Sequence, residues 1–202
     1  MNKLAIDFYD RKDVVVIAKE MIGKILFTRI DGKIISGRIV ETEAYAGISD
    51  KASHAFGGRR TARNEPMYGS AGIVYVYLCY GLHQMLNVVT NNLGIPHAIL
   101  VRAVEPLTGI ETMMERTGKR EGDNTITKGP GNVARAFGIK KIHSGASLTG
   151  EEIFLASDDY LPTPAKIGTS KRIGVDYAGE DSLLPYRFYL KGNKFVSGGI
   201  TK

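Results

Sequence analysis

The sequence has few of the residues that build disulfide frameworks or metal centres: one cysteine, Cys79, and four histidines among 202 residues. A single cysteine excludes an internal disulfide, and one cysteine with scattered histidines does not make a Cys/His metal site. No run approaches the ~18 apolar residues of a membrane span, and the opening MNKLAIDFYD has no apolar core of a signal peptide. We therefore expect a soluble protein of a reducing compartment.

The composition is that of one domain with a basic surface. With 43% hydrophobic residues, the chain can bury one substantial core, so we predict a single domain over residues 1–202. The net charge of +6 favours an acidic partner such as nucleic acid, although many basic enzymes bind none.

Hydrophobic periodicity alternates between helical and strand spacing along the chain, with glycines marking the breaks. We predict an α+β fold with a mostly antiparallel sheet. Helices are expected within residues 13–23, 108–118 and 129–139, and strands within 25–30, 34–45, 72–81, 83–91, 97–106, 151–157, 165–175 and 185–190.

The stretch GRIVETEAYAGISDKASHAF gathers two carboxylates, a phenol and an imidazole. In a strand, Glu41, Glu43 and Tyr45 would share one face, with the carboxylates roughly 7 Å apart. If that face were buried, one carboxylate could be held ionised by an arginine while the other stayed free as a base. Two interpretations remain open: a solvated strand edge, or a small-molecule or nucleobase pocket that Tyr45 and His54 complete.

A tyrosine-rich segment, GIVYVYLCYG, is followed by HQMLNVVTN, which indicates a hairpin with Tyr80 and Gly81 near its tip. An aromatic ring at an exposed hairpin tip makes no favourable contact with water, so its position needs another explanation. In a nucleic-acid protein it can stack on a base or wedge between base pairs. Core packing is the alternative, and we favour it for Tyr75.

Two arginine patterns are also open to two interpretations. The loop GGRRTARN carries Arg59, Arg60 and Arg63, either as a solvated basic loop or as phosphate contacts. The apolar strand AILVRAVEP contains a lone cation, Arg102, which when buried needs a carboxylate such as Glu41 or Glu105, or a phosphate.

Together these blocks resemble the alkyladenine (3-methyladenine) DNA glycosylase family. The segments GRIVETEAY, SHAFGGRRTARN, GIVYVYLCYGLHQMLNVV, ILVRAVEPL and GPGNVARAFGI carry the resemblance, which covers nearly the whole chain in the same order. It implies an enzyme that flips alkylated or deaminated purines out of duplex DNA and hydrolyses the N-glycosidic bond. The fold it implies is a curved antiparallel sheet with packed helices, like the C-terminal domain of formyltransferases.

The resemblance also implies roles around the reacting nucleotide. Glu43 matches the general base that activates water, and Arg102 a residue that holds the nucleotide's phosphate and orders water and base. Tyr45, His54 and Tyr77 match the walls of the base pocket.

Three further roles concern discrimination and DNA contact. Asn87 matches a pocket residue that excludes guanine by clashing with its amino group. Tyr80 matches the residue that fills the gap in the base stack, and Arg59 and Arg63 would contact phosphates. Lys128, before the GPG block, departs from the family pattern and leaves the substrate range open.

The implied reaction needs one base and one water, because an N3- or N7-alkylated purine already carries positive charge and leaves without an acid. Glu41 could be a second stabilising carboxylate, but we favour a structural ion pair for it. No lysine lies in the core motifs; Lys51 is the nearest. We therefore expect a monofunctional glycosylase without lyase activity and without a metal or organic cofactor.

The enzyme would be a monomer acting on damaged double-stranded DNA in base excision repair, in the cytoplasm and at the bacterial nucleoid. Two alternatives remain: a non-catalytic nucleic-acid binding module on the same scaffold, and a hydrolase of free nucleosides. The first would not need Glu43, and the second would not need Tyr80 or the arginine loop.

Overall fold

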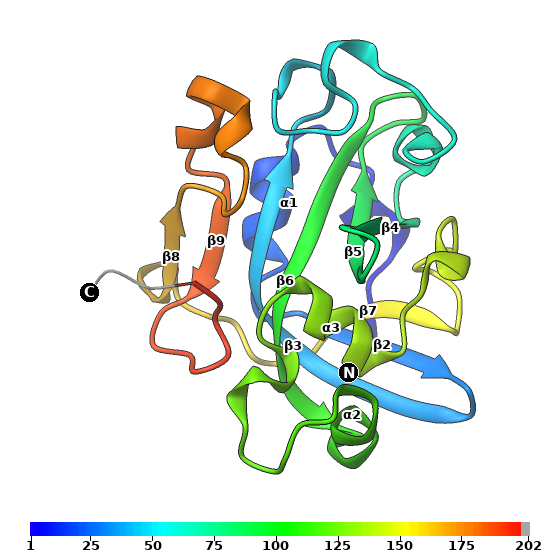
Figure 1. The fold of residues 1–202 in the computed structure, drawn as a ribbon, viewed down its shortest axis with the longest axis vertical. Helices are drawn as coiled ribbons and strands as arrows, with labels where there is room; N and C mark the ends of the chain where they lie inside the picture. Colours follow the sequence, from blue (N-terminus) through cyan, green and yellow to red (C-terminus); the bar gives the residue numbers. More distant parts are fainter. Residues whose placement is uncertain (199–202) are drawn as a thin grey trace.

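A twisted antiparallel sheet runs through the molecule (Figure 1). The computed structural model describes residues 1–198 of the chain. The strand order is β1-β7-β2-β3-β6-β5-β4, and β9, itself paired with β8, joins at β3. The strands are β1 (Asn2–Lys3), β2 (Ile25–Ile30), β3 (Lys33–Tyr45), β4 (Val74–Cys79), β5 (His83–Thr90), β6 (His97–Thr108), β7 (Ile153–Ser157), β8 (Ile167–Ser170) and β9 (Arg187–Leu190). The predicted α+β class is confirmed.

Three α-helices in the described residues, α1 (Val14–Glu20), α2 (Ile110–Thr117) and α3 (Pro130–Phe137), pack on this sheet. The Asp13 carboxylate caps α1 by accepting hydrogen bonds from the backbone of Val15 and Val16 at 2.9 and 3.0 Å. Helix α3 ends at Gly138, whose φ of 73° is the left-handed conformation that glycine adopts without strain. The helices predicted in these three segments are therefore confirmed.

The two faces of strands β3, β6, β5 and β4 have different chemistry. One row of cross-strand neighbours, Ala44, Ile99, Val88 and Val74, is apolar and belongs to the main hydrophobic core. The adjacent row, on the opposite face because side chains alternate, carries Glu43, Leu100, Asn87 and Tyr75. The sheet thus separates the core from a face with polar side chains.

Strand β3 lies in the interior of the sheet. Its first half pairs with β2, residues 41–43 pair with β9, and β6 runs along its other edge. Glu41 and Glu43 are consequently flanked by strands on both sides and are fully buried. The interpretation that Glu41 and Glu43 lie on a solvated strand edge, which the sequence left open, is therefore wrong.

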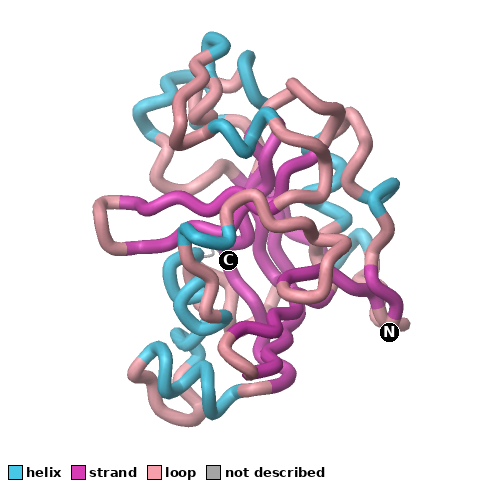
Figure 2. The backbone as a smooth tube through the Cα atoms, turned by 90° about the vertical axis from the view of Figure 1, so that its right-hand side faces the viewer, coloured by secondary structure: helices cyan, strands magenta, loops and turns pink. Residues whose placement is uncertain are grey.

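Two hairpins turn through residue pairs with positive φ. Asp31 and Gly32 join β2 to β3 with φ of 56° and 68°, and Tyr80 and Gly81 join β4 to β5 with 49° and 71°. Positive φ at both central positions is the type I′ geometry that matches strand twist. The predicted hairpin tip at Tyr80 is confirmed, and the β4–β5 hairpin projects sideways from the body of the molecule (Figure 2).

The strand predicted over residues 165–175 is only partly present. Strand β8 ends at Ser170, and residues 171–175 form an irregular loop. The backbone leaves the sheet because the Arg172 side chain turns inward to Asp50, and Gly174 adopts a φ of 76°. This correction matters because the loop enters the site described below.

Close contact between β3 and β6 depends on Gly37. A Cβ there would press on Val104 and lie 2.8 Å from the carbonyl oxygen of Glu105. We expect Gly37→Ala to destabilise the fold by about 1–3 kcal/mol, the usual cost of overpacking. Urea unfolding would measure it, with Lys33→Ala, exposed on the same strand, as the control. An unchanged midpoint for Gly37→Ala would contradict the close packing.

Candidate active site

A cavity of about 480 Å³ opens on the polar face of the sheet, beside the β4–β5 hairpin and the 171–175 loop. That volume falls within the range of small-molecule pockets, about 300–1,000 Å³. The walls include the predicted site residues Tyr45, His54, Arg63, Tyr77, Tyr80, Asn87 and Arg102. The structure thus gathers residues from widely separated segments around one space.

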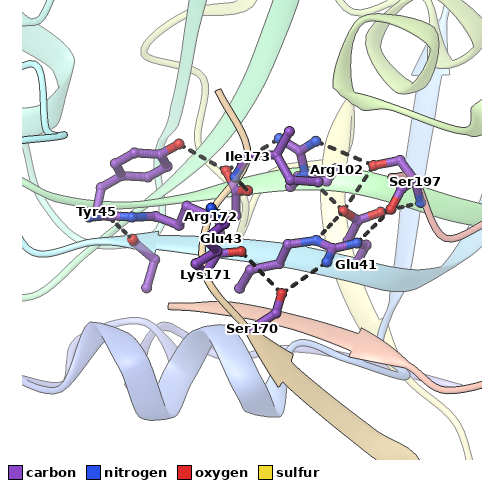
Figure 3. Close-up of polar contacts among 11 residues, drawn as sticks. Glu41, Glu43, Tyr45, Arg102, Ser170, Lys171, Arg172, Ile173 and Ser197 are labelled. Atoms are coloured by element: carbon purple, nitrogen blue, oxygen red, sulfur yellow. Dashed lines mark hydrogen bonds and ion pairs between the residues drawn. The ribbon is translucent and has the colours of Figure 1, made fainter. Parts of the chain in front are cut away.

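The Glu43 carboxylate lies directly behind the wall of this cavity. Its Oε2 accepts hydrogen bonds from the Tyr45 hydroxyl at 2.9 Å and from Arg102 at 3.3 Å. Among the described residues, its Oε1 accepts one bond, from the backbone N–H of Ile173 at 2.8 Å (Figure 3). A carboxylate oxygen can accept about two hydrogen bonds, so Oε1 keeps a site for a further donor such as water.

Glu41, two residues earlier, is bonded to different groups. Within the described residues, its Oε1 accepts from Arg102, Arg187 and the Ser197 hydroxyl at 2.9, 2.8 and 2.9 Å, and its Oε2 from the Ser197 backbone at 2.6 Å (Figure 3). Arg187 and Ser197 do not line the cavity, so Glu41 is bonded mainly to the framework behind it. The structural ion pair that we favoured for Glu41 is what the structure contains.

The electrostatics of Glu43 combine opposing effects. Burial raises the pKa of the Glu43 carboxyl above its ordinary value, and the nearby charge of Glu41 adds to the rise. The positive charge of Arg102, the N–H of Ile173 and the Tyr45 hydroxyl act in the opposite direction. The result is a carboxylate with raised basicity that remains hydrogen-bonded, which suits proton abstraction from water.

An aromatic cluster forms another wall of the cavity. The His54 ring meets Tyr77 edge-on, with centroids 4.6 Å apart, and Tyr75 and Tyr77 are 5.5 Å apart. His54 Nδ1 and the Tyr75 hydroxyl are hydrogen-bonded at 2.9 Å. Tyr75 is buried, as the core-packing interpretation expected, and it also fixes the orientation of the His54 ring.

The Asn87 amide completes the floor of the cavity. Its Nδ2 donates to the carbonyl oxygens of Tyr75 and Met85 at 3.2 and 3.1 Å. Two backbone anchors on adjacent strands hold the amide in one orientation, so Asn87 can act as a fixed steric element of the pocket.

The predicted DNA-contact residues surround the mouth. Tyr80 is 92% exposed at the hairpin tip, and Arg63 lies over the Tyr77 ring at 5.0 Å. Arg59 lines a neighbouring cavity of about 340 Å³ that also includes His54 and Arg63. Asn64, which is buried, donates to the carbonyl oxygens of His54 and Arg59 and so pins the basic loop beside the pocket.

Several residues of the site were missed from the sequence. The Ile173 N–H, Arg172, Arg187 and Ser197 come from outside the segments that we singled out, whereas Asp50, the partner of Arg172, lies within the stretch that carries Glu41 and Glu43. Arg187 carries the same signal that identified Arg102, a lone cation in an apolar run, but Arg172 follows Lys171 in a polar stretch. Neither pattern revealed the partners of these arginines, which lie more than 100 residues away in the chain.

Within residues 1–198 no helix is both long and apolar enough to cross a membrane. Across that same range, no three His, Cys, Asp or Glu side chains gather as metal ligands would.

The sequence model of the methylpurine-DNA glycosylase family matches residues 7–194. The chain belongs to this family, which makes it a hydrolase of the N-glycosylase class that works in DNA repair by base excision.

Individual relatives agree over almost the full length. A protein of Desulfitobacterium hafniense is 43% identical, with 98% of this chain and 99% of the relative aligned. A protein of Clostridium acetobutylicum is 44% identical over 96% and 97%, and one of Chlamydia felis is 43% identical over 93% and 95%. Each relative is assigned as a 3-methyladenine DNA glycosylase.

The buried position of His54 has a measurable consequence. Burial, aided by the charges of Arg63 and Arg59, lowers the pKa of His54 to about 4. The ring therefore stays neutral at pH 6, and stability is lost as pH falls from about 6.5 toward 4, where the unfolded chain takes up the proton. NMR titration of the ring should give a midpoint near 4, and Arg63→Ala should raise it. A midpoint near 6.5 in the native protein would contradict this environment.

Proposed function

We propose that this protein is a monofunctional glycosylase that flips alkylated or deaminated purines out of duplex DNA and hydrolyses their N-glycosidic bond. One observation carries the proposal. Glu43 is a buried carboxylate whose three donors within the described residues, Tyr45, Arg102 and Ile173, all line an aromatic cavity of about 480 Å³. A binding module would gain nothing from burying a carboxylate of raised pKa against that wall.

Base flipping is supported by the conformation of Tyr80. A bulky residue at positive φ costs roughly 1–2 kcal/mol, and a side chain that is 92% exposed returns no packing energy to the fold. The ring instead projects where it can enter the space that a flipped nucleotide leaves. Restacking there offsets part of the few kcal/mol that extrusion costs.

The flipped base would bind among Tyr45, His54 and Tyr77. Base–aromatic stacking contributes roughly 1–3 kcal/mol per base. Because His54 Nδ1 is engaged by Tyr75, the ring offers Nε2 to the base edge. The anchored Asn87 would exclude guanine through its exocyclic amino group.

Bond cleavage would use Glu43 as the general base. Water bound at the free position of Oε1 would give up a proton to the carboxylate as it attacks the sugar, and the negative charge would stabilise the cationic transition state. Arg102 would keep Glu43 ionised and in place. Glu41 would keep a structural role, because it bonds to two arginines and Ser197, and of these groups only Arg102 lines the cavity.

A monofunctional reaction is consistent with the lining of the cavity, which includes no lysine among the described residues. Lys51, the nearest candidate in the sequence, lines the neighbouring cavity with Arg59 and Arg63. Within residues 1–198, no amine lines the cavity, which supports a reaction without a Schiff base to the sugar. Arg59 and Arg63 would contact phosphates of the duplex, which a single copy of the chain would bind.

Glu43→Gln keeps the shape of the side chain and removes the base. We expect duplex binding to survive and the single-turnover excision rate to fall about 10²–10⁴-fold. The assay is release of a single 7-methylguanine or 3-methyladenine from a duplex, with Glu105→Gln on β6 as the control. Excision at the native rate by Glu43→Gln would contradict the assignment of Glu43 as the general base.

Tyr80→Ala tests base flipping separately from chemistry. We expect a large loss of excision for a lesion in a stable pair and a smaller loss for the same lesion in a mismatch, where less stacking and pairing is given up. Thermal stability should change by no more than about 0.5 kcal/mol, because the side chain is exposed. Equal losses on both substrates, with a fall in melting temperature, would mean that Tyr80 is structural.

A further inference from the structure

The Arg172–Asp50 pair is the most deeply buried ion pair outside the Glu41–Glu43 cluster in the described chain. The side-chain exposures are 0% and 1%. Arg172 makes two bonds to the carboxylate, from Nη1 at 2.5 Å and from Nη2 at 2.8 Å. A forked pair of this kind fixes direction as well as distance.

Three segments converge on this pair. Arg172 Nη1 also donates to the carbonyl oxygen of Ala44, between Glu43 and Tyr45 on β3, at 2.9 Å. Its Nη2 donates to the carbonyl oxygen of Asp181 at 3.1 Å. Asp50, in turn, accepts from the backbone N–H groups of Ala46 and Ala52 at 3.0 Å each. The end of β3, the loop that follows it and the 171–175 loop are thereby tied together.

Both sides of the Glu43 site depend on those segments. The residue after Arg172, Ile173, donates the only hydrogen bond received by Glu43 Oε1 from the described chain, and its side chain lines the cavity. The Arg172 guanidinium also lies 4.9 Å from the Tyr45 ring, whose hydroxyl bonds to Oε2 (Figure 3). Moving Arg172 would therefore disturb the donors on both carboxylate oxygens.

We propose that Arg172 and Asp50 are positioning residues that set the geometry and the proton affinity of Glu43. The proposal rests on the proposed function, since it takes Glu43 as the base. Neither side chain touches the Glu43 carboxylate directly; each acts through the Ile173 N–H and the Tyr45 ring.

The effect on pH dependence follows from the groups around Glu43. Tyr45 and Glu41 face it from its own strand, Arg102 from β6, and Ile173 from the loop. Arg187, its neighbour on β9, is bonded to Glu41 instead. Loss of the Ile173 N–H and of the Arg172 charge removes two features that favour the carboxylate, so the pKa of Glu43 would rise.

The test compares Arg172→Gln and Asp50→Asn with native protein in single-turnover excision of 7-methylguanine from a duplex across pH. A cationic leaving group needs no general acid, so the acid limb of the pH–rate profile reports the ionisation of the general base. We expect the limb to move up by about one pH unit in Arg172→Gln, which corresponds to the loss of one hydrogen bond to a charged group. The rise should be smaller in Asp50→Asn, which keeps the Arg172 charge and loosens only the position of the loop. Duplex affinity should be unchanged.

The chain offers a matched control in Arg38 and Asp158. Arg38 also makes a forked pair, at 3.0 and 2.7 Å, and donates to the Gly23 carbonyl oxygen at 2.8 Å, but it does not contact the cavity. Arg38→Gln should lower the melting temperature without moving the acid limb. Arg172→Lys, which keeps the charge and one bond, should recover part of the shift.

The Arg172→Gln/Asp50→Asn double variant should shift the limb no further than Arg172→Gln alone, because Asp50 acts on Glu43 through Arg172. If Arg172→Gln does not fold, Asp50→Asn and Arg172→Lys carry the comparison. Acid limbs that coincide with native protein and with Arg38→Gln would overturn the proposal and leave the pair purely structural. Native-rate excision by Glu43→Gln would instead overturn the base assignment itself.

Discussion

Two carboxylates buried side by side in the middle of a sheet are the constraint on which the rest of the site depends. Glu41 and Glu43 are both fully buried on β3. An unpaired buried charge costs several kcal/mol, so the fold must bring cations to them. Arg102 comes from β6 and bonds to both, and Arg187 comes from β9 and bonds to Glu41.

The same constraint separates the roles of two chemically identical side chains. Within the described residues, Glu41 bonds to two arginines and to Ser197, and of these groups Arg102 alone lines the cavity. The three donors to Glu43 are Tyr45, Arg102 and the Ile173 N–H, and all three residues line the cavity. In our proposal the environment, rather than the residue type, decides which carboxylate reacts, as is common where two acidic groups share an active site.

Around the rest of the cavity, hydrogen bonds fix the orientation of the side chains. His54 is oriented by the Tyr75 hydroxyl, Asn87 by two carbonyl groups, and the basic loop by Asn64. Tyr80 is held away from the protein by a turn that strains its own backbone. A preformed pocket beside one exposed ring fits a protein that must hold a base after removing it from a helix.

The sequence by itself determined the local features. Asp31-Gly32 and Tyr80-Gly81 set the two hairpin turns, Asp13 and Gly138 set helix ends, and alternation placed Glu43 and Tyr45 beside one another. Each of these depends on interactions within a few residues, where side-chain chemistry limits the backbone directly. The family resemblance added the candidate site residues, and the structure places them around or directly beside one cavity.

Only the tertiary structure decided how the charges are shared. Spacing could not show whether Arg102 would meet Glu41 or Glu105, or which carboxylate would have all its donors on the cavity wall. It also could not show that residues 171–175 would leave the predicted strand to bond Glu43. These outcomes rest on partners 59 to 156 positions apart. They also rest on register shifts in the β3–β6 ladder, between Ile39 and Glu41 and between Glu41 and Thr42. A bulge changes which side chains share a face, and its position depends on how two distant strands pack, which no local pattern records.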